Sequence, residues 1–213
     1  MFIGHWAPAL AVAARRPAPT IGILFIAAQL IDWAFFGFLL LGVEHMRVSP
    51  GISTMNPMDL YHMPYTHSLL GALVFGGGVT VVIWTLTKDS TAALLTGAVV
   101  VSHWFLDLLV HVPDLTLAGS PPKLGFGLWN YPALEMPLEL GITFAALCLY
   151  VRAKRPAPLR VGVLAGVLLL LQAINWFGPV EPEVTIGTSL LAFFAYGLAT
   201  LAAWWVGSSE KSA

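Results

Sequence analysis

The chain has 213 residues, of which 58% are hydrophobic and only 10% are charged, and its mean hydropathy is +0.81. A soluble globular protein carries about 25% charged residues, so this composition excludes that class and predicts an integral membrane protein. The formal net charge of −1, without a dense basic patch, excludes nucleic acid as the main partner. The single cysteine, Cys148, excludes an internal disulfide framework and a zinc site built from cysteines.

Apolar segments follow one another along almost the whole chain. Residues 2–14 are too short to cross a bilayer, so we expect a half-membrane or re-entrant helix that ends at Arg15 and Arg16. This arginine pair follows the apolar segment, which reverses the order of a secretory signal, and His5 is expected to stay in the mature protein. Longer apolar runs predict six transmembrane helices, at about 20–43, 67–87, 91–112, 134–152, 158–178 and 185–207. The predicted fold class is all-α, a polytopic transmembrane helical bundle in a single integral membrane domain over residues 1–213.

Two long connections, 44–66 and 113–133, are rich in Pro, Gly and polar residues, and the order of the spans places both on one side, where we expect a cap. That side holds Arg47 and Lys123. The opposite side holds Arg15, Arg16, Lys88, Arg152, Lys154, Arg155, Arg160 and Lys211. Because cytoplasmic loops are enriched in Lys and Arg, we expect the long connections to face the periplasm or exterior.

His103, Asp107 and His111 stand four residues apart within one apolar run. An α-helix turns about 100° per residue, so the three side chains lie within an arc of about 80°. Ionisable groups at membrane depth are costly and usually face a site, a cavity or a partner. The spacing is typical of metal ligands, although His111 lies near the end of the run, where it could also contact solvent or lipid phosphate.

Other ionisable residues are expected at a similar depth. Asp32 lies about 18 Å from the cytoplasmic start of its helix, and the short first helix would lift His5 toward it. His67 begins the next span, and Glu135 and Glu139 share one face of a later helix. A lone Asp or His in a span is often a helix–helix hydrogen-bonding residue, but together these residues predict one pocket. The predicted metal ligands are His5, Asp32, His67, His103, Asp107 and His111.

Imidazole and carboxylate ligands favour a divalent metal: one or two ions, zinc first, with manganese or iron as alternatives. Two neighbouring cations can activate water and stabilise the oxygens of a phosphoryl group. Proton transfer is assigned to Glu139 or, from the first long connection, Asp59.

Four segments, GHWAPAL, AAQLIDW, PYTHSLL and SHWFLDLLVHVPDL, resemble the YdjM-like family of bacterial inner-membrane proteins, to which metal-dependent hydrolase activity is attributed. The resemblance covers roughly residues 1–140, which would build most of the site, and it implies that the protein lies in a bacterial inner (cytoplasmic) membrane. The ligand order is also similar to that of zinc-dependent phospholipase C and its related nucleases. By that likeness Asp32, His67, His103 and Asp107 hold one metal, and Asp107 bridges to a second held partly by His5.

The later part of the phospholipase pattern departs from this chain. A His-x-x-x-Glu motif completes the cluster there, whereas this chain has PALEMPLE and lacks the histidine. A third metal is therefore not expected from the resemblance, and the possible substitutes are His111, Glu135 and Glu139.

The function expected from the sequence is a membrane-embedded metal-dependent hydrolase of the phosphoesterase type. Its partners would be membrane lipid and a phosphoester substrate, a phospholipid or another lipid-linked phosphate, reached from the outer side; the sequence does not indicate an oligomeric state. Two alternatives stay open. A transporter or channel for a divalent metal or proton would use the same residues as a transit site, and a non-catalytic scaffold would use them as structural contacts.

Overall fold

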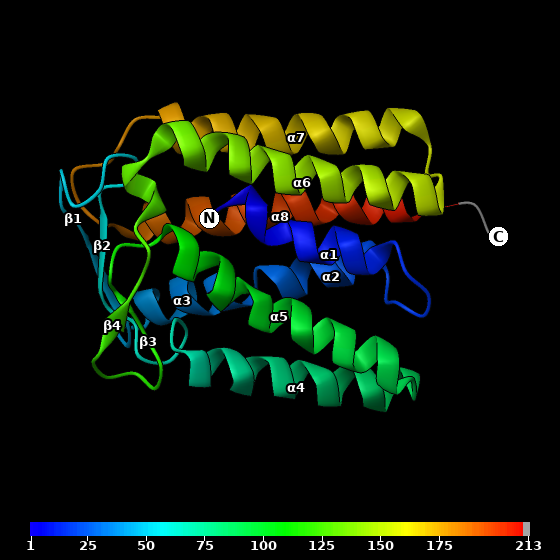
Figure 1. Cartoon of the computed structure of the whole chain (residues 1–213), viewed down its shortest axis with the longest axis horizontal. Helices are drawn as coiled ribbons and strands as arrows, with labels where there is room; N and C mark the ends of the chain where they lie inside the picture. Colours follow the sequence, from blue (N-terminus) through cyan, green and yellow to red (C-terminus); the bar gives the residue numbers. More distant parts are fainter. Residues whose placement is uncertain (211–213) are drawn as a thin grey trace.

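The computed structural model describes residues 1–210, and long α-helices make up most of it (Figure 1). Five helices are long and apolar enough to cross a membrane: α4 (Leu69–Thr87), α5 (Ser90–Val110), α6 (Pro132–Lys154), α7 (Pro158–Phe177) and α8 (Ile186–Gly207). Each agrees with a predicted span to within two residues at either end. The protein is therefore an all-α, multi-pass helical bundle, as the hydropathy pattern predicted.

The first predicted span is divided into two helices. α2 (Ile21–Ala28) and α3 (Leu30–Leu40) meet at Gln29 with a bend of 50°. The prediction of one continuous helix at 20–43 is wrong in this respect, because hydropathy reports how apolar a segment is and not whether its hydrogen bonding is continuous. Since the last carbonyl groups of a helix have no partner within it, the break at Gln29 leaves the Ala28 carbonyl free for a distant donor.

The N-terminal segment forms a short helix within the bundle. It consists of η1 (Ile3–His5) and α1 (Trp6–Ala13), in agreement with the short helix predicted at 2–14. α1 packs against α2, α5 and α6, and Trp6 is fully buried with its indole N–H donating to the Phe25 carbonyl at 3.2 Å. In Figure 1 the N-terminus lies among the helices, nearer to the end that carries the strands than to the opposite end. This short helix therefore brings His5 into the interior.

α4 and α5 form a closely packed helical hairpin. A Cβ atom added at Gly76 would lie 2.9 Å from the Gly97 carbonyl oxygen, and one added at Gly97 would lie 2.7 Å from the Gly76 carbonyl oxygen. Glycine at both positions thus allows the two backbones to approach, as small residues commonly do between membrane helices.

The two long connections lie together at one end of the bundle (Figure 1). The first forms an antiparallel hairpin of β1 (His45–Val48) and β2 (Met58–His62), in which Arg47 pairs with Asp59. The second forms β3 (Leu115–Thr116) and β4 (Lys123–Leu124), followed by the short helix η2 (Leu128–Asn130). These short strands were not predicted. Their connections close the end of the bundle that lies nearest to His67 and His111.

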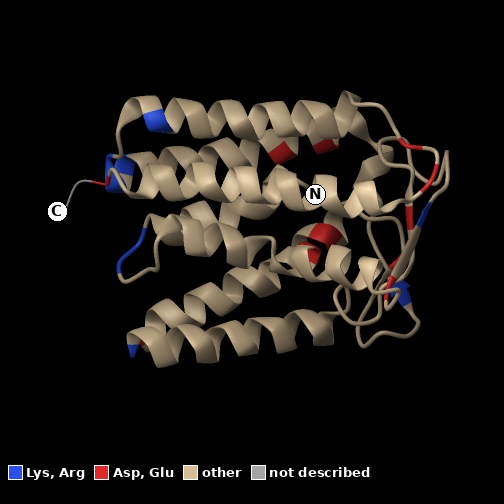
Figure 2. Cartoon of the chain, turned by 180° about the vertical axis from the view of Figure 1, so that it is seen from behind, with Lys and Arg blue, Asp and Glu red and all other residues tan. Residues whose placement is uncertain are grey.

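Basic residues divide between the two ends of the bundle (Figure 2). The loop end carries Arg47 and Lys123. The opposite end carries Arg15, Arg16, Lys88, Arg152, Lys154, Arg155 and Arg160; Lys211 is outside the described residues. Figure 2 also shows acidic residues between the ends, within the helices.

Candidate metal centre

Six ionisable side chains gather where the N-terminal segment meets α3 and α5. His5 comes from η1, Asp32 from α3, and His67 from the turn before α4. α5 supplies His103 and Asp107, and His111 follows its last residue. The residue exposures are His5 1%, His67 3%, His103 1%, Asp107 1% and His111 3%, and the Asp32 side chain is 15% exposed. All six ligands predicted from the sequence therefore lie in this cluster.

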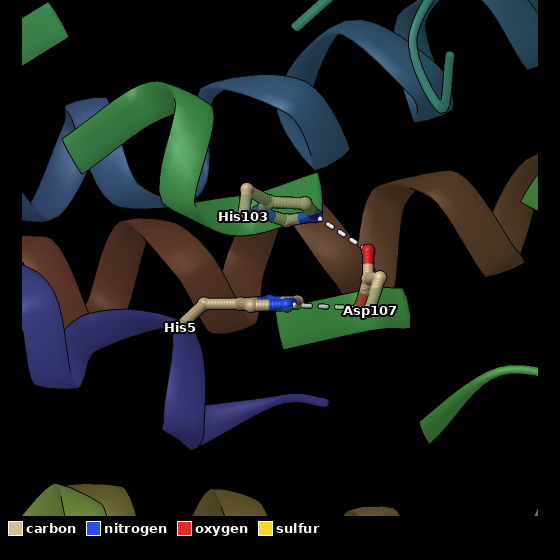
Figure 3. A group of neighbouring side chains, drawn as sticks. All are labelled: His5, His103 and Asp107. Atoms are coloured by element: carbon tan, nitrogen blue, oxygen red, sulfur yellow. Dashed lines mark hydrogen bonds and ion pairs between the residues drawn. The ribbon is translucent and has the colours of Figure 1, made fainter. Parts of the chain in front are cut away.

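Asp107 lies at the centre of the cluster, and its two oxygens face different histidines. Its Oδ1 is 2.9 Å from His5 Nε2 and 3.4 Å from His111 Nε2. Its Oδ2 is 3.1 Å from His103 Nε2 and 3.6 Å from His67 Nε2. Figure 3 shows the rings of His5 and His103 stacked, with both directed toward the Asp107 carboxylate. The Met1 nitrogen also lies 2.9 Å from Oδ1.

Asp32 faces the same two histidines as Asp107 Oδ2. Its Oδ1 is 3.4 Å from His67 Nε2 and 3.5 Å from His103 Nε2. Its other oxygen, Oδ2, accepts hydrogen bonds from the Tyr196 hydroxyl at 3.2 Å and from the Gln29 amide at 3.4 Å. Gln29 at the helix break and Tyr196 of α8 thus orient the carboxylate so that Oδ1 points into the cluster.

The spacing of these atoms fits a bound metal ion. Ligand atoms about 2.1 Å from a tetrahedral ion lie about 3.4 Å from one another. The four distances that join His67 and His103 to the two carboxylates run from 3.1 to 3.6 Å. Single ligand atoms of Asp32, His67 and His103 lie within 4.8 Å of one another, and the same holds for His5, His103 and Asp107. The cluster could therefore hold a metal ion.

The hydrogen bond that His103 makes on the side away from the cluster determines which of its ring nitrogens carries the proton. His103 Nδ1 is 2.9 Å from the Ala28 carbonyl oxygen, and a carbonyl only accepts, so Nδ1 carries the proton. In the neutral ring Nε2 then presents a lone pair toward carboxylate oxygens of Asp107 and Asp32. Nε2 of His103 and Oδ2 of Asp107 lack a hydrogen-bond partner among the described residues. A lone pair facing two carboxylates requires a second proton or a metal cation between them.

His67 and His111 are held in the same way. His67 Nδ1 is 2.9 Å from the Thr66 hydroxyl oxygen, whose proton goes to Glu44 at 2.6 Å, so the hydroxyl accepts from Nδ1. His111 Nδ1 is 2.9 Å from Asp114 Oδ1. Three histidines thus donate outward through Nδ1 and present Nε2 inward, the arrangement typical of metal-ligating histidines.

His111 lies just beyond the last residue of α5. Burial lowers the pKa of its imidazole, but Asp107 and Asp114 outweigh that effect and raise the pKa to about 9. The solvent or lipid contact considered for His111 is wrong, because the ring is buried and hydrogen-bonded on the Nδ1 side.

The two residues expected to transfer protons have other partners. Asp59, on β2, accepts a hydrogen bond from Arg47 at 2.7 Å. Glu139 accepts from the backbone amides of Phe2 and Gly4, and from the Gln172 amide at 2.9 Å. The structure places Glu139 against the N-terminal segment and Asp59 on the β1–β2 hairpin at the loop end of the bundle.

Glu135 lies one turn before Glu139 on α6 and has a different environment. It is fully buried, and both of its carboxylate oxygens lack a hydrogen-bond partner among the described residues. Sequence reasoning had ranked it below Glu139.

Several supporting residues were not identified from the sequence. The spacing HVPD places Asp114 three residues after His111, which is a usable local signal. No such signal exists for Glu44, which belongs to the other long connection and reaches His67 only through Thr66.

Comparison of the chain with family models, curated proteins and solved structures finds no match. The fold and the site define a multi-pass helical membrane protein with a buried His/Asp cluster that could hold a metal ion. Its resemblance to the YdjM-like family stays a prediction.

Proposed function

We propose that this protein is a membrane-embedded metal-dependent phosphoesterase that acts on a phospholipid or another lipid-linked phosphate. The observation that carries the proposal is the set of four distances of 3.1 to 3.6 Å that join His67 and His103 to the Asp32 and Asp107 carboxylates, since neighbouring ligand atoms around one ion are separated by about 3.4 Å. Histidine and carboxylate ligands without cysteine favour zinc, with manganese or iron as alternatives.

The arrangement around Asp107 supports a two-ion centre. Oδ2 faces His67 and His103, which also face Asp32, whereas Oδ1 faces His5 and His111. A carboxylate between two such groups can bridge two cations, which is the role that the resemblance to phospholipase C implies for Asp107. When bound, the two ions would supply Lewis-acid stabilisation of phosphoryl oxygens and activate water at neutral pH.

Glu135 differs from Glu139 in that its carboxylate oxygens are not engaged by a hydrogen-bond donor among the described residues. Both oxygens of Glu139 are already engaged, whereas those of Glu135 are buried without a donor. Gly4 binds Glu139 and the next residue, His5, binds Asp107, so one short segment links α6 to the cluster. We assign to Glu135 the exchange of a proton with the leaving group or the attacking water.

The position of the cluster supports a substrate held in the membrane. His67 lies just before α4 and His111 just after α5, where these apolar helices meet the long connections, so a substrate anchored in the bilayer can present its phosphate at that level. The excess of Lys and Arg at the other end favours a loop end on the periplasmic or external side.

The first test is the metal content of the purified protein, measured by inductively coupled plasma mass spectrometry. We expect one or two divalent ions per wild-type chain, and loss of metal in His103→Ala and Asp107→Ala. His62→Ala removes an exposed histidine of β2 and serves as the control that keeps its metal. Full metal content in both site variants would overturn the ligand assignment.

A metal-loaded protein then allows the hydrolysis to be tested separately. Wild-type protein should release phosphorylated head group or free phosphate from mixed phospholipid vesicles, and Asp107→Ala should not. Metal flux into proteoliposomes without hydrolysis would instead support the transporter alternative.

A further inference from the structure

A chain of hydrogen bonds behind His67 begins at a buried carboxylate. Glu44 lies between α3 and β1 and is fully buried. Its Oε1 accepts from the backbone amides of Tyr65 at 2.8 Å and Thr66 at 2.9 Å, and its Oε2 accepts from the Thr66 hydroxyl at 2.6 Å. No Lys or Arg forms an ion pair with it among residues 1–210. Hydrogen bonds therefore compensate the burial of this carboxylate, and all three come from Tyr65 and Thr66, the two residues before His67.

The direction of every hydrogen bond in this chain follows from Glu44. A carboxylate only accepts, so the single hydroxyl proton of Thr66 points toward it. The Thr66 oxygen can then only accept from His67, which places the ring proton on Nδ1. The lone pair of His67 Nε2 is left facing the carboxylates of the metal centre.

We infer that Glu44 is a positioning residue of the metal centre, which holds His67 through Thr66 in the tautomer that can bind a cation. The carboxylate also makes the imidazole a stronger ligand, because it polarises the N–H bond through the Thr66 hydroxyl. This inference rests on the metal site of the proposed function but is independent of hydrolysis.

A purely structural role would give a different result on substitution. In that case Glu44 would only hold the turn before α4 through the amides of Tyr65 and Thr66. The carbonyl of glutamine can accept both of those bonds, so Glu44→Gln would be nearly silent. On our inference the amide group of the glutamine donates to the Thr66 oxygen, and the Thr66 proton, which has lost its carboxylate acceptor, turns to His67 Nδ1. The ring would move its proton to Nε2, and that proton would point into the centre.

The test uses the full chain in detergent with Co²⁺ and Zn²⁺ alone. Affinity is measured by competition with a chromophoric chelator, and coordination by the visible absorption of Co²⁺. We expect Glu44→Gln to weaken binding by about 10- to 100-fold, the usual effect of losing such a partner. Thr66→Ser, which keeps the hydroxyl, should bind within about threefold of the wild type. Glu210→Gln, which alters a carboxylate bonded to Tyr150, is the matched control and should bind normally.

A double variant separates the two roles most clearly. Thr66→Val removes the hydroxyl through which Glu44 sets the proton position on His67. Adding Glu44→Gln to Thr66→Val should therefore cause no further loss of metal affinity. Multiplied losses in the double variant, or a Glu44→Gln protein that binds like the wild type, would overturn the inference. If Glu44→Gln fails to fold, the inference is tested by comparing Thr66→Ser with Thr66→Val. We expect Thr66→Val to bind metal more weakly than Thr66→Ser, and equal affinity of these two variants would contradict the inference.

The outcome also separates this inference from the proposed function. Metal binding that depends on His103 and Asp107 but not on Glu44 refutes the inference alone. Dependence on Glu44 without phospholipid hydrolysis refutes only the phosphoesterase, and a wild type that binds neither ion refutes both.

Discussion

Burial has different consequences for the two glutamates of α6. Glu139 accepts hydrogen bonds from backbone amides of the N-terminal segment and from the side-chain amide of Gln172, and these bonds compensate its lost hydration. Glu135 receives none from the described residues, and an uncompensated carboxylate at this depth is expensive. A residue kept in so costly a state is a candidate for function.

The variant Glu135→Gln tests the proton-transfer assignment. A glutamine side chain keeps the shape of the glutamate but cannot exchange a proton, so we expect kcat to fall by about 10²- to 10⁴-fold while metal content stays at the wild-type value. Steady-state kinetics and mass spectrometry of the same preparation measure both quantities. Glu181→Gln, in the exposed connection before α8, is the control. An unchanged kcat would refute the assignment, and lost metal would make Glu135 a ligand instead.

Each ligand depends on the element that carries it. α5 presents His103 and Asp107 on one face, and the break between α2 and α3 supplies the Ala28 carbonyl that orients His103. α5 is itself positioned by close packing on α4 through Gly76 and Gly97. Displacement of this hairpin would therefore move Asp107, which lies at the centre of the His/Asp cluster.

Two neighbouring glycines of α4 provide a matched test of that packing. A methyl group at Gly76 would lie 2.7 Å from a Val101 side-chain carbon and 2.9 Å from the Gly97 carbonyl, whereas one at Gly77 meets nothing within 4 Å. We expect Gly76→Ala to lower the free energy of unfolding by about 1–3 kcal/mol. Gly77→Ala should be neutral or slightly stabilising, because Ala favours helix by about 1 kcal/mol over Gly. Thermal unfolding in detergent measures both, and equal stability of the two variants would contradict the packing argument.

The whole molecule is polarised along the direction of its helices. One end holds the two strand-containing connections with Arg47 and Lys123, and the other holds most of the basic residues (Figure 2). Because membrane potential and anionic lipid favour Lys and Arg on the cytoplasmic side, this division predicts an orientation.

Thiol labelling in intact and broken cells tests this orientation. In a Cys148→Ser background, Ser120→Cys places a thiol in the exposed β3–β4 connection, and Ser90→Cys places one at the opposite end. A membrane-impermeant maleimide should label position 120 in intact cells or spheroplasts and position 90 only after lysis. The reverse pattern would place the loop end in the cytoplasm and refute the proposed external site.

Sequence alone determined the class of fold and the six residues that form the buried His/Asp cluster. Hydropathy reports directly the cost of placing each segment in lipid, so the long spans were predictable to within two residues. Helical periodicity placed His103 and Asp107 on one face, because a turn of about 100° per residue is a local property.

Tertiary structure alone decided how those side chains are held. The hydrogen bond from His103 to the Ala28 carbonyl and the one from the Gly4 amide to Glu139 join segments that are far apart in the chain. The same is true of Glu44, which reaches His67 from a different connection through Thr66. Periodicity and composition describe neighbours along the chain, whereas the direction of a hydrogen bond depends on which distant donor or acceptor the packing brings within about 3 Å.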